Sequence, residues 1–412
     1  MEEWKEYKIS DLYDVHNGLS KGGKFFGSGY PFLSFKAVFN HYFIPNTLSD
    51  LVNASEKERL AFNIKRGDVF ITRTSENAEE LGMSCVALKD YPDATYNGFT
   101  KRLRPKNDVV VPEYIGYYLR SLFFRSFFYG LASSMSTRAS LSNGDLLNMT
   151  VKLPPVSTQK GIASILKSFD DKIECNKLIN DNLEQQAQAL FKSWFVDFEP
   201  FKDGEFVESE MGMIPKGWKV KSLSGIADYR NGLAMQKFRP LDGEIGLPVL
   251  KIKELGQGLC DDSSELCSPS MIGEKYIVND GDIVFSWSGT LMVKLWCGGK
   301  CGLNQHLFLV DPQGFPNWFA YQWTKQHLYN FIRIAKDKAV TMGHIKRGEL
   351  DRAKVVVPNE MGMYSINALM EPLFKQIIAI QIESRRLAQL RDALLPRLTS
   401  GELKVNDLET IK

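Results

Sequence analysis

The chain has 412 residues, which suggests two to four domains, and its hydrophobic share of 44% is that of a soluble protein with sizeable cores. The formal net charge of +2 excludes a uniformly basic surface, so nucleic-acid binding would require local clusters of Lys and Arg. The charged N-terminal segment has no signal-peptide character and no segment approaches a membrane span. We therefore expect a cytoplasmic protein without membrane contact, whose 6 cysteines are reduced.

An internal repeat covers almost the whole chain. Short segments of the first half return in the second half, in the same order. The aligned pairs are Trp4–Ile9 with Trp218–Leu223, Asn17–Leu19 with Asn231–Leu233, Gly29–Leu33 with Gly246–Leu250, Arg66–Ile71 with Asp280–Phe285, Asn97–Phe99 with Asn304–His306, and Val151–Pro154 with Val355–Pro358. The order along the chain is therefore a globular region, a long helix, a second globular region and a second long helix.

The globular regions, residues 1–155 and 218–357, are each predicted to be mixed α/β. In each region a Gly-Asp turn enters a short buried strand, and a β-branched strand stopped by proline ends the region. Helices with Pro in the first turn are expected over 112–128 and 316–332. The aromatic residues of the first of these helices are interpreted as core rather than as a stacking surface for nucleic acid.

The first long helix, over 156–198, carries a coiled-coil seam without a Pro or Gly from Ile162 onward. At about 1.5 Å per residue it is a rod of roughly 50–60 Å, which needs a partner helix along the seam. The seam positions are Ile162, Leu166, Phe169, Ile173, Asn176, Asn180, Leu183, Ala187, Leu190 and Trp194.

The second long helix, over 358–412, repeats this ladder. The matching positions are Ile366, Met370, Leu373, Ile377, Ile380, Ser384, Leu387, Arg391, Leu394 and Leu398. Pro372 interrupts it, so we expect a helix that ends near Met370 or one that restarts with Pro372 in its first turn.

These elements predict two α/β (α+β) domains in tandem repeat, separated by two long α-helices that form an antiparallel coiled coil. Residues 199–217, rich in Pro and Gly, are the linker between the first helix and the second domain. The arrangement would hold two similar domains at a fixed separation about a pseudo-twofold axis. The alternative is two amphipathic helices within one globular core.

The sequence carries no recognisable catalytic motif. The segment Gly18–Lys24 resembles a phosphate-binding loop, but Phe25 stands where Ser or Thr should bind magnesium and no helix follows. Phe25–Gly29 resembles a fragment of an S-adenosylmethionine loop and fails for the same reason. The histidines and cysteines lack the spacing of a zinc site, so no metal site and no enzymatic activity are expected.

Two similar domains at a fixed separation favour a ligand with repeated, spaced features, such as double-stranded DNA. Base and phosphate contacts require polar and basic side chains on loops. The candidate DNA-binding residues of the first region are Lys21, Lys24, Thr72, Arg73, Thr74, Ser136, Thr137 and Arg138. Those of the second region are Lys237, Arg239, Thr341, His344, Lys346 and Arg347.

The chain resembles the specificity subunits of type I restriction-modification systems. The repeated Asn-Gly-Leu starts carry this resemblance together with three longer segments. These are Ser193–Pro200 (SWFVDFEP), Glu208–Trp218 (ESEMGMIPKGW) and Leu394–Leu403 (LLPRLTSGEL). The resemblance covers essentially the whole chain and implies two target-recognition domains separated by two long antiparallel helices.

The resemblance further implies a bipartite DNA target whose spacer length is set by the helices. It implies two modification subunits, which bind S-adenosylmethionine and methylate adenine, and restriction (motor) subunits that join for cleavage; this chain itself would hold no cofactor. Two other readings remain open. One is a non-catalytic coiled-coil adaptor whose domains bind protein partners, and the other is a stand-alone DNA methyltransferase or nuclease.

Overall fold

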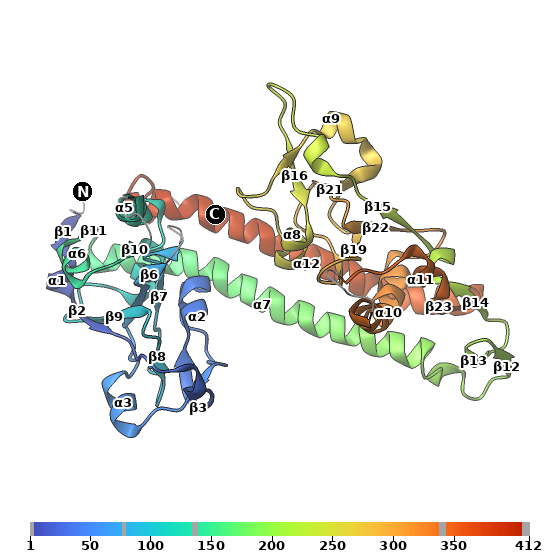
Figure 1. The fold of residues 1–412 in the computed structure, drawn as a ribbon, viewed down its shortest axis with the longest axis horizontal. Coiled ribbons are helices and arrows are strands. Elements are labelled where there is room, and N and C mark those ends of the chain that lie inside the picture. The colour runs from blue at the N-terminus through green and yellow to red at the C-terminus, as the bar shows by residue number, and fades with distance from the viewer. Residues whose placement is uncertain (1–3, 76–79, 134–138, 338–342, 406–412) are drawn as a thin grey trace. The chain divides into compact units, whose positions relative to one another are not determined.

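The computed structural model describes residues 4–75, 80–133, 139–337 and 343–405 and divides the chain into two compact units (Figure 1). Unit 1 comprises Met1–Asp171 and Ala388–Lys412, and unit 2 comprises Lys172–Leu387. Each unit therefore holds one globular region and a part of both long helices. These helices are α7 (Val156–Phe195) and α12 (Glu360–Ser400), and both continue from one unit into the other.

The globular region of unit 1 is mixed helix and sheet, as predicted. Its strands are β1 (Lys5–Lys8), β2 (Tyr13–Asn17), β3 (Phe26–Leu33), β4 (Leu51–Val52), β5 (Val69–Thr72), β6 (Thr74–Ser75), β7 (Ser84–Val86), β8 (Thr95–Tyr96), β9 (Thr100–Pro105), β10 (Ala139–Ser140) and β11 (Thr150–Leu153). Its helices are α1 (Ile9–Leu12), α2 (Phe35–Asn40), α3 (Glu56–Ala61), α4 (Pro112–Tyr118), α5 (Leu122–Ser133) and α6 (Asn143–Asn148).

Unit 2 repeats this arrangement after a hairpin of β12 (Phe206–Ser209) and β13 (Gly212–Pro215). Its other strands are β14 (Lys219–Ser222), β15 (Ala227–Asn231), β16 (Leu247–Leu250), β17 (Leu266–Cys267), β18 (Ile277–Val278), β19 (Ile283–Ser286), β20 (Met292–Leu295), β21 (Cys301–Leu303), β22 (Leu307–Pro312) and β23 (Lys354–Val357). Its helices are α8 (Ile252–Gln257), α9 (Pro269–Ile272), α10 (Asn317–Asp337) and α11 (Arg347–Arg352).

The strand order shows that the sequence repeat is a structural repeat. Unit 1 contains a four-stranded antiparallel sheet in the order β2-β9-β5-β7, and unit 2 contains one in the order β15-β22-β19-β20. The first strand of each globular region pairs with its last strand, β1 with β11 and β14 with β23. The parallel pairs β3-β8 and β16-β21 also correspond. The main sheet and these strand pairs are thus built twice, while the smaller sheet has the order β4-β3-β8 in unit 1 and β17-β16-β21-β18 in unit 2.

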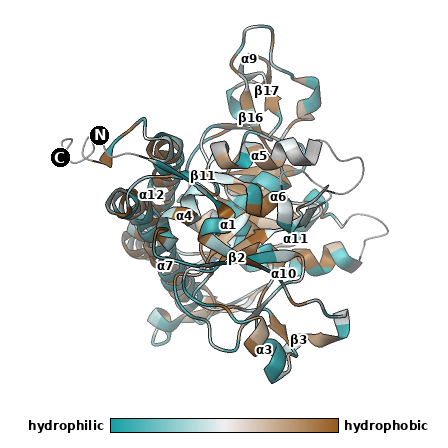
Figure 2. Cartoon of the chain, turned by 90° about the vertical axis from the view of Figure 1, so that its left-hand side faces the viewer, coloured by the Kyte–Doolittle hydropathy of each residue, from teal (hydrophilic) through white to brown (hydrophobic). Residues whose placement is uncertain are grey.

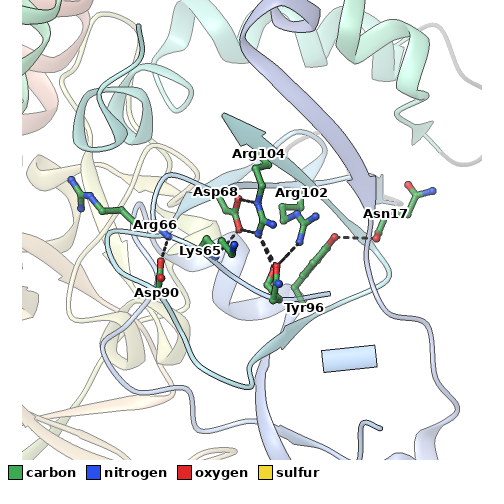
Figure 3. Close-up of polar contacts among 9 residues, drawn as sticks. Asn17, Lys65, Arg66, Asp68, Asp90, Tyr96, Arg102 and Arg104 are labelled. Atoms are coloured by element: carbon green, nitrogen blue, oxygen red, sulfur yellow. Dashed lines mark hydrogen bonds and ion pairs between the residues drawn. The ribbon is translucent and has the colours of Figure 1, made fainter. Parts of the chain in front are cut away.

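The Gly-Asp turn before β5 is fixed by a buried ion pair in unit 1 (Figure 3). The carboxylate of Asp68, which is fully buried, accepts the backbone N–H of Lys65 at 2.7 Å and two guanidinium N–H groups of Arg104 at 2.6 and 2.8 Å. Arg102 on the same strand donates to the carbonyl of Asn63 at 2.7 Å. These two arginines are therefore committed to the fold, because a buried charge must be paired.

Unit 2 keeps the turn but not the arginines. Asp282 accepts the backbone N–H of Asn279 at 2.7 Å, while β22 carries Leu309 and Asp311 where β9 carries Arg102 and Arg104. Burial raises the pKa of Asp282 above its ordinary value. The repeat thus keeps the backbone of the turn, but the charged side chains of β9 are not kept in β22.

The expected helix over 112–128 is two helices in the structure, α4 and α5, separated at Leu119–Ser121. Ser121 makes the break because its hydroxyl donates to the carbonyl of Tyr118 at 2.7 Å and accepts the N–H of Phe124 at 3.4 Å. The aromatic residues of α4, including Tyr114 and Tyr117, are buried, so the core interpretation of this stripe is confirmed.

The predicted seam is confirmed along both long helices. None of the ladder positions named above is exposed, although α7 and α12 carry many hydrophilic residues, as the colouring in Figure 2 shows. In unit 1 the guanidinium of Arg391 binds the carboxylate of Asp170 at 2.5 Å. In unit 2 the side-chain amide of Asn176 donates to Glu383 at 2.8 Å and to the hydroxyl of Ser384 at 3.2 Å. The two helices therefore contact each other in both units.

Each globular region is tied to the helices by a charged contact. In unit 1 the hydroxyl of Tyr117 donates to Asp170 at 2.5 Å, next to the ion pair with Arg391. In unit 2 Arg385 of α12 binds both carboxylate oxygens of Asp280, at 2.7 and 2.8 Å, and this pairing lowers the pKa of the carboxyl group. Bidentate pairs of this kind fix orientation as well as distance.

The expectation that Pro372 ends or restarts the second helix is wrong. Helix α12 runs without interruption from Glu360 to Ser400. Pro372 and Ala368, the residue whose carbonyl loses its helical donor, both lie on the exposed face. Water can satisfy that carbonyl, while Met370 and Phe374 on the opposite face are buried in the core of unit 2. Packing outweighs the local cost of proline.

The two asparagines make the seam less stable than an apolar one. Asn180 is 8% exposed, and its side-chain carbonyl has no hydrogen-bond partner among the described residues. Such a buried polar atom costs about 1–3 kcal/mol. We expect Asn180→Leu to raise the free energy of unfolding by about 1 kcal/mol, measured by chemical denaturation of the full chain.

Asn182 provides the matched control, because it lies on the exposed face of the same helix. The substitution Asn182→Leu should change stability by less than about 0.5 kcal/mol. A loss of stability in Asn180→Leu would show that this side chain is satisfied by a group other than those described.

Candidate nucleic-acid interface

The repeated Asn-Gly-Leu segments pack their glycines directly against a second repeated loop. A Cβ atom on Gly18 would lie 2.0 Å from the carbonyl oxygen of Asn97, and one on Gly232 would lie 2.3 Å from the carbonyl oxygen of Asn304. No side chain fits such a gap, so only glycine allows this approach. The Asn-Gly-Leu segment and the loop that begins at Asn97 or Asn304 are far apart in the chain, and they pack together in each unit.

The same backbone hydrogen bonds fix this loop in both units. In unit 1 the N–H of Gly18 donates to Thr100 at 3.2 Å, and the N–H of Thr100 donates to Asn97 at 3.0 Å. In unit 2 Gly232 donates to Leu307 at 3.1 Å, and Leu307 donates to Asn304 at 3.0 Å. The loops 97–100 and 304–307 are therefore equivalent and rigid.

The asparagine side chain completes each loop. The Oδ1 atom of Asn97 accepts the backbone N–H of Phe99 at 2.7 Å, and that of Asn304 accepts the N–H of His306 at 3.2 Å. Both asparagines also form a bridge to the leucine of the Asn-Gly-Leu segment, Leu19 and Leu233. The third loop residue, Phe99 or His306, is thus held at the same place in the two units.

Two further chain segments join each loop. The backbone carbonyl of Arg73 accepts the N–H of Leu141 at 2.8 Å, and that of Trp287 accepts the N–H of Ile345 at 3.1 Å. Helices α6 and α11 begin directly after these contacts. We call the resulting set the loop cluster. Its equivalent positions are Asn17, Arg73, Phe99, Lys101 and Asn143 in unit 1, and Asn231, Trp287, His306, Phe308 and Arg347 in unit 2.

The loop cluster of unit 1 carries its charge on the sheet. The ammonium group of Lys101 on β9 donates to the side-chain oxygens of Asn17, at 3.3 Å, and of Asn143. Desolvation and the neighbouring charge of Arg73 lower the pKa of Lys101. The side chain of Phe99, two residues before Lys101, is 55% exposed. Lys101 itself is only 4% exposed, so the surface combines Arg73, amides and an exposed ring, which suits an anionic ligand with aromatic or methyl groups.

The loop cluster of unit 2 carries an aromatic ring where unit 1 carries Lys101, and it carries a cation where unit 1 carries Asn143. Phe308 takes the place of Lys101, and the cation is Arg347 on α11, whose guanidinium lies 6.0 Å from the centre of the Phe308 ring. It also donates to the carbonyl of Tyr229 at 2.8 Å. Trp287 replaces Arg73, with its ring 6.2 Å from that of His306. The two units therefore present different chemistry on one backbone.

The candidate DNA-binding residues of unit 1 differ in how far they are free to bind. Lys24 is exposed on the 3₁₀ turn Gly23–Phe25, whereas Lys21 is mostly buried in an ion pair with Glu58 at 2.8 Å. Thr72 is fully buried and accepts the N–H of Met83 at 2.9 Å. Arg73 belongs to the loop cluster, and Thr74 lies beside it in β6. Ser136, Thr137 and Arg138 lie outside the described residues.

The candidates of unit 2 are mostly exposed. Lys237 lies on the 3₁₀ turn Met235–Lys237, and Arg239 pairs with Glu265 at 3.1 Å. His344 bridges to Ser288 beside Trp287, and Lys346 and Arg347 follow at the start of α11. Thr341 lies outside the described residues. The structure thus brings Arg73 and Arg347 into the loop clusters of their units, at different positions of the repeat, and leaves Lys237 and Arg239 elsewhere.

The sequence-based list missed most of the loop cluster. It contained neither Phe99 and Lys101 nor Trp287 and His306. The repeated pairs Asn-Gly-Leu and Asn-x-x were visible in the sequence, but nothing there placed one against the other. A glycine and an asparagine that recur together at equivalent positions would have been the signal for this site.

The fold and the loop cluster define a protein with two tandem recognition domains joined by long helices. Residues 1–185 and 215–390 match the family model of the type I restriction modification DNA specificity domain, and the chain belongs to this family. None of the helices in the described part of the chain has the length and apolar composition that a bilayer crossing requires. Within the same part, no group of three or more His, Cys, Asp or Glu residues is placed to hold a metal ion.

Related proteins match over nearly the full length of the chain. The MjaIX specificity subunit of Methanocaldococcus jannaschii is 29% identical over 420 residues, which cover 98% of this chain and 95% of that protein. The HindI specificity subunit of Haemophilus influenzae is 23% identical over 470 residues, covering 98% and 100%. The structure of a type I restriction-modification S subunit from M. genitalium has the same fold, with a TM-score of 0.56, 13% identity and 96% of each chain covered.

The close packing of Gly18 gives a direct test of the loop cluster. We expect Gly18→Ala to displace loop 97–100 and to cost about 1–3 kcal/mol, because the new methyl group overlaps the Asn97 carbonyl. Gly22→Ala is the matched control, since nothing lies within 4 Å of a Cβ atom there. Chemical denaturation measures both, and equal stability of the two variants would contradict the packing.

Proposed function

We propose that this chain is the DNA-specificity subunit of a type I restriction-modification complex, in which each globular region recognises one half of a bipartite DNA target. The observation that carries the proposal is the loop cluster. It occurs twice on the same backbone, and its side chains differ between the units. A protein that recognises two different half-sites in the same way requires this combination of a fixed frame and variable contacts.

The residues support DNA as the ligand of both clusters. Lys and Arg neutralise phosphates, while amide, imidazole and apolar side chains contact base edges in the groove. Unit 1 provides Arg73 and the amide of Asn143, which the buried Lys101 holds, and unit 2 provides Arg347, His306 and Trp287. Lys24, Lys237, Arg239, Lys346 and His344 are proposed as further contacts in the two globular regions.

As a member of the specificity-subunit family, the chain is non-catalytic and acts with two modification subunits and with restriction subunits. The long helices are proposed to set the spacer between the half-sites, because both run without a break from unit 1 into unit 2. The modification subunits are proposed to dock on the helical region. We propose that these tasks divide along the chain as follows: globular regions over 1–155 and 218–357, helices over 156–198 and 358–412, and a linker over 199–217.

Methylation of a host genome with and without this gene tests the proposal, with the modification partner active in both strains. The expected result is a split motif of modified adenines that is present only with the gene. A genome without any gene-dependent motif would instead favour a coiled-coil adaptor whose domains bind protein. Specific binding of the complex to DNA should also weaken steeply as salt rises, because several phosphates release counterions.

Helix length should control the spacer independently of the half-sites. We expect that seven residues inserted after Asp171 in α7, together with seven before Ala388 in α12, will lengthen the helices by about 10 Å. This corresponds to roughly three base pairs of spacer. The control inserts two residues at each place, which turns the apolar face of each helix by about 200° and should abolish methylation. A changed half-site sequence in the seven-residue variant would contradict this role of the helices.

A further inference from the structure

The third residue of each repeated loop combines a hydrogen-bonded backbone with an exposed side chain. Phe99 is 55% exposed, yet its N–H is bound by Asn97 at 2.7 Å and its carbonyl accepts the N–H of Arg73 at 2.9 Å. An exposed phenylalanine gains nothing from burial in the folded chain. Its position is thus fixed by the backbone and not by packing of its own ring.

The equivalent residue of unit 2 is a histidine whose ring is oriented by hydrogen bonds. The Nδ1 atom of His306 lies 3.1 Å from the hydroxyl of Ser288, and its Nε2 atom lies 3.3 Å from the side-chain nitrogen of Gln305. Trp287 lies beside the ring at 6.2 Å between centres. One loop position therefore carries an apolar side chain in unit 1 and a hydrogen-bonding one in unit 2.

An arginine lies near each of the two side chains. Arg73 donates its backbone N–H to the carbonyl of Phe99 in unit 1, and Arg347 lies over Phe308, two residues from His306, in unit 2. A basic residue that holds the DNA backbone would direct the side chain near it toward the base edges.

We propose that Phe99 and His306 each determine one base pair of the half-site that their own unit recognises. Resting on the proposed function, this inference assigns different chemistry to the two positions. The ring of Phe99 can contact the C5 methyl group of a thymine and can make no hydrogen bond. The Nε2 atom of His306, once released from Gln305, can donate to an acceptor such as a purine N7 atom. The half-site of unit 1 therefore has an A·T pair at this position, and that of unit 2 has a purine on the strand that His306 contacts.

The test uses the complex of this chain with its modification subunits. Methylation rates are measured on duplexes in which each base pair of both half-sites is replaced in turn. In Phe99→Ala the preference at one base pair of the unit 1 half-site should fall roughly tenfold, because the methyl contact is lost, and the other half-site should be unaffected. His306→Ala should have the reciprocal effect.

Two variants separate base recognition from a general loss of structure. Phe99→Leu keeps an apolar side chain and should retain the preference for A·T. Leu60→Ala on α3 removes another exposed apolar side chain, 68% exposed, and should change no preference. Thermal denaturation should give similar melting temperatures for all four variants, since neither loop residue is part of a core.

Unchanged base preferences in Phe99→Ala or His306→Ala, or an equal relaxation of both half-sites, would overturn the inference while the proposed function stood. A wild-type complex without any bipartite preference would instead overturn the proposed function. The two failures are therefore distinguishable in one set of measurements.

Discussion

The burial of the seam between α7 and α12 within each unit is the constraint on which the rest of the structure depends. A helix of this length with an apolar stripe cannot remain in water alone, and each helix supplies the other with the surface that it needs. The seam also contains polar positions, at Asn176 and Ser384, which bind each other. A buried asparagine costs stability but distinguishes the correct register from its neighbours. The polar contact thus favours one register of the two helices, while the apolar positions hold them together.

In each globular region, the contacts that hold the loop cluster in place are separate from the side chains that differ between the two units. We call these contacts the frame. The frame consists of backbone hydrogen bonds, two glycines without room for a side chain, and the asparagine that closes each loop. None of these contacts depends on the side chains of the loop cluster. Arg73 and Trp287 occupy the same place without a change in the surrounding strands, because only their backbone groups are used. Recognition can therefore change while the fold is kept.

Basic residues in this chain serve two physically distinct purposes. Arg104 is bound to the fully buried Asp68, and removal of either partner would leave an uncompensated charge in the core. Arg347, at an exposed position on α11, stacks on a ring and keeps part of its guanidinium available. The near-neutral net charge of the chain is compatible with binding to an anionic polymer only if charges of the second kind are concentrated locally.

The sequence by itself determined the repeat, the mixed α/β regions and the seam, because hydrophobic periodicity and turn residues act over short distances along the chain. It did not determine the fate of Pro372, since the cost of a lost hydrogen bond depends on which face of the helix meets water. Nor did it reveal the loop cluster, whose members come from segments far apart in the sequence. Gly18 reveals its role only beside Asn97, and only the tertiary structure decides that they meet.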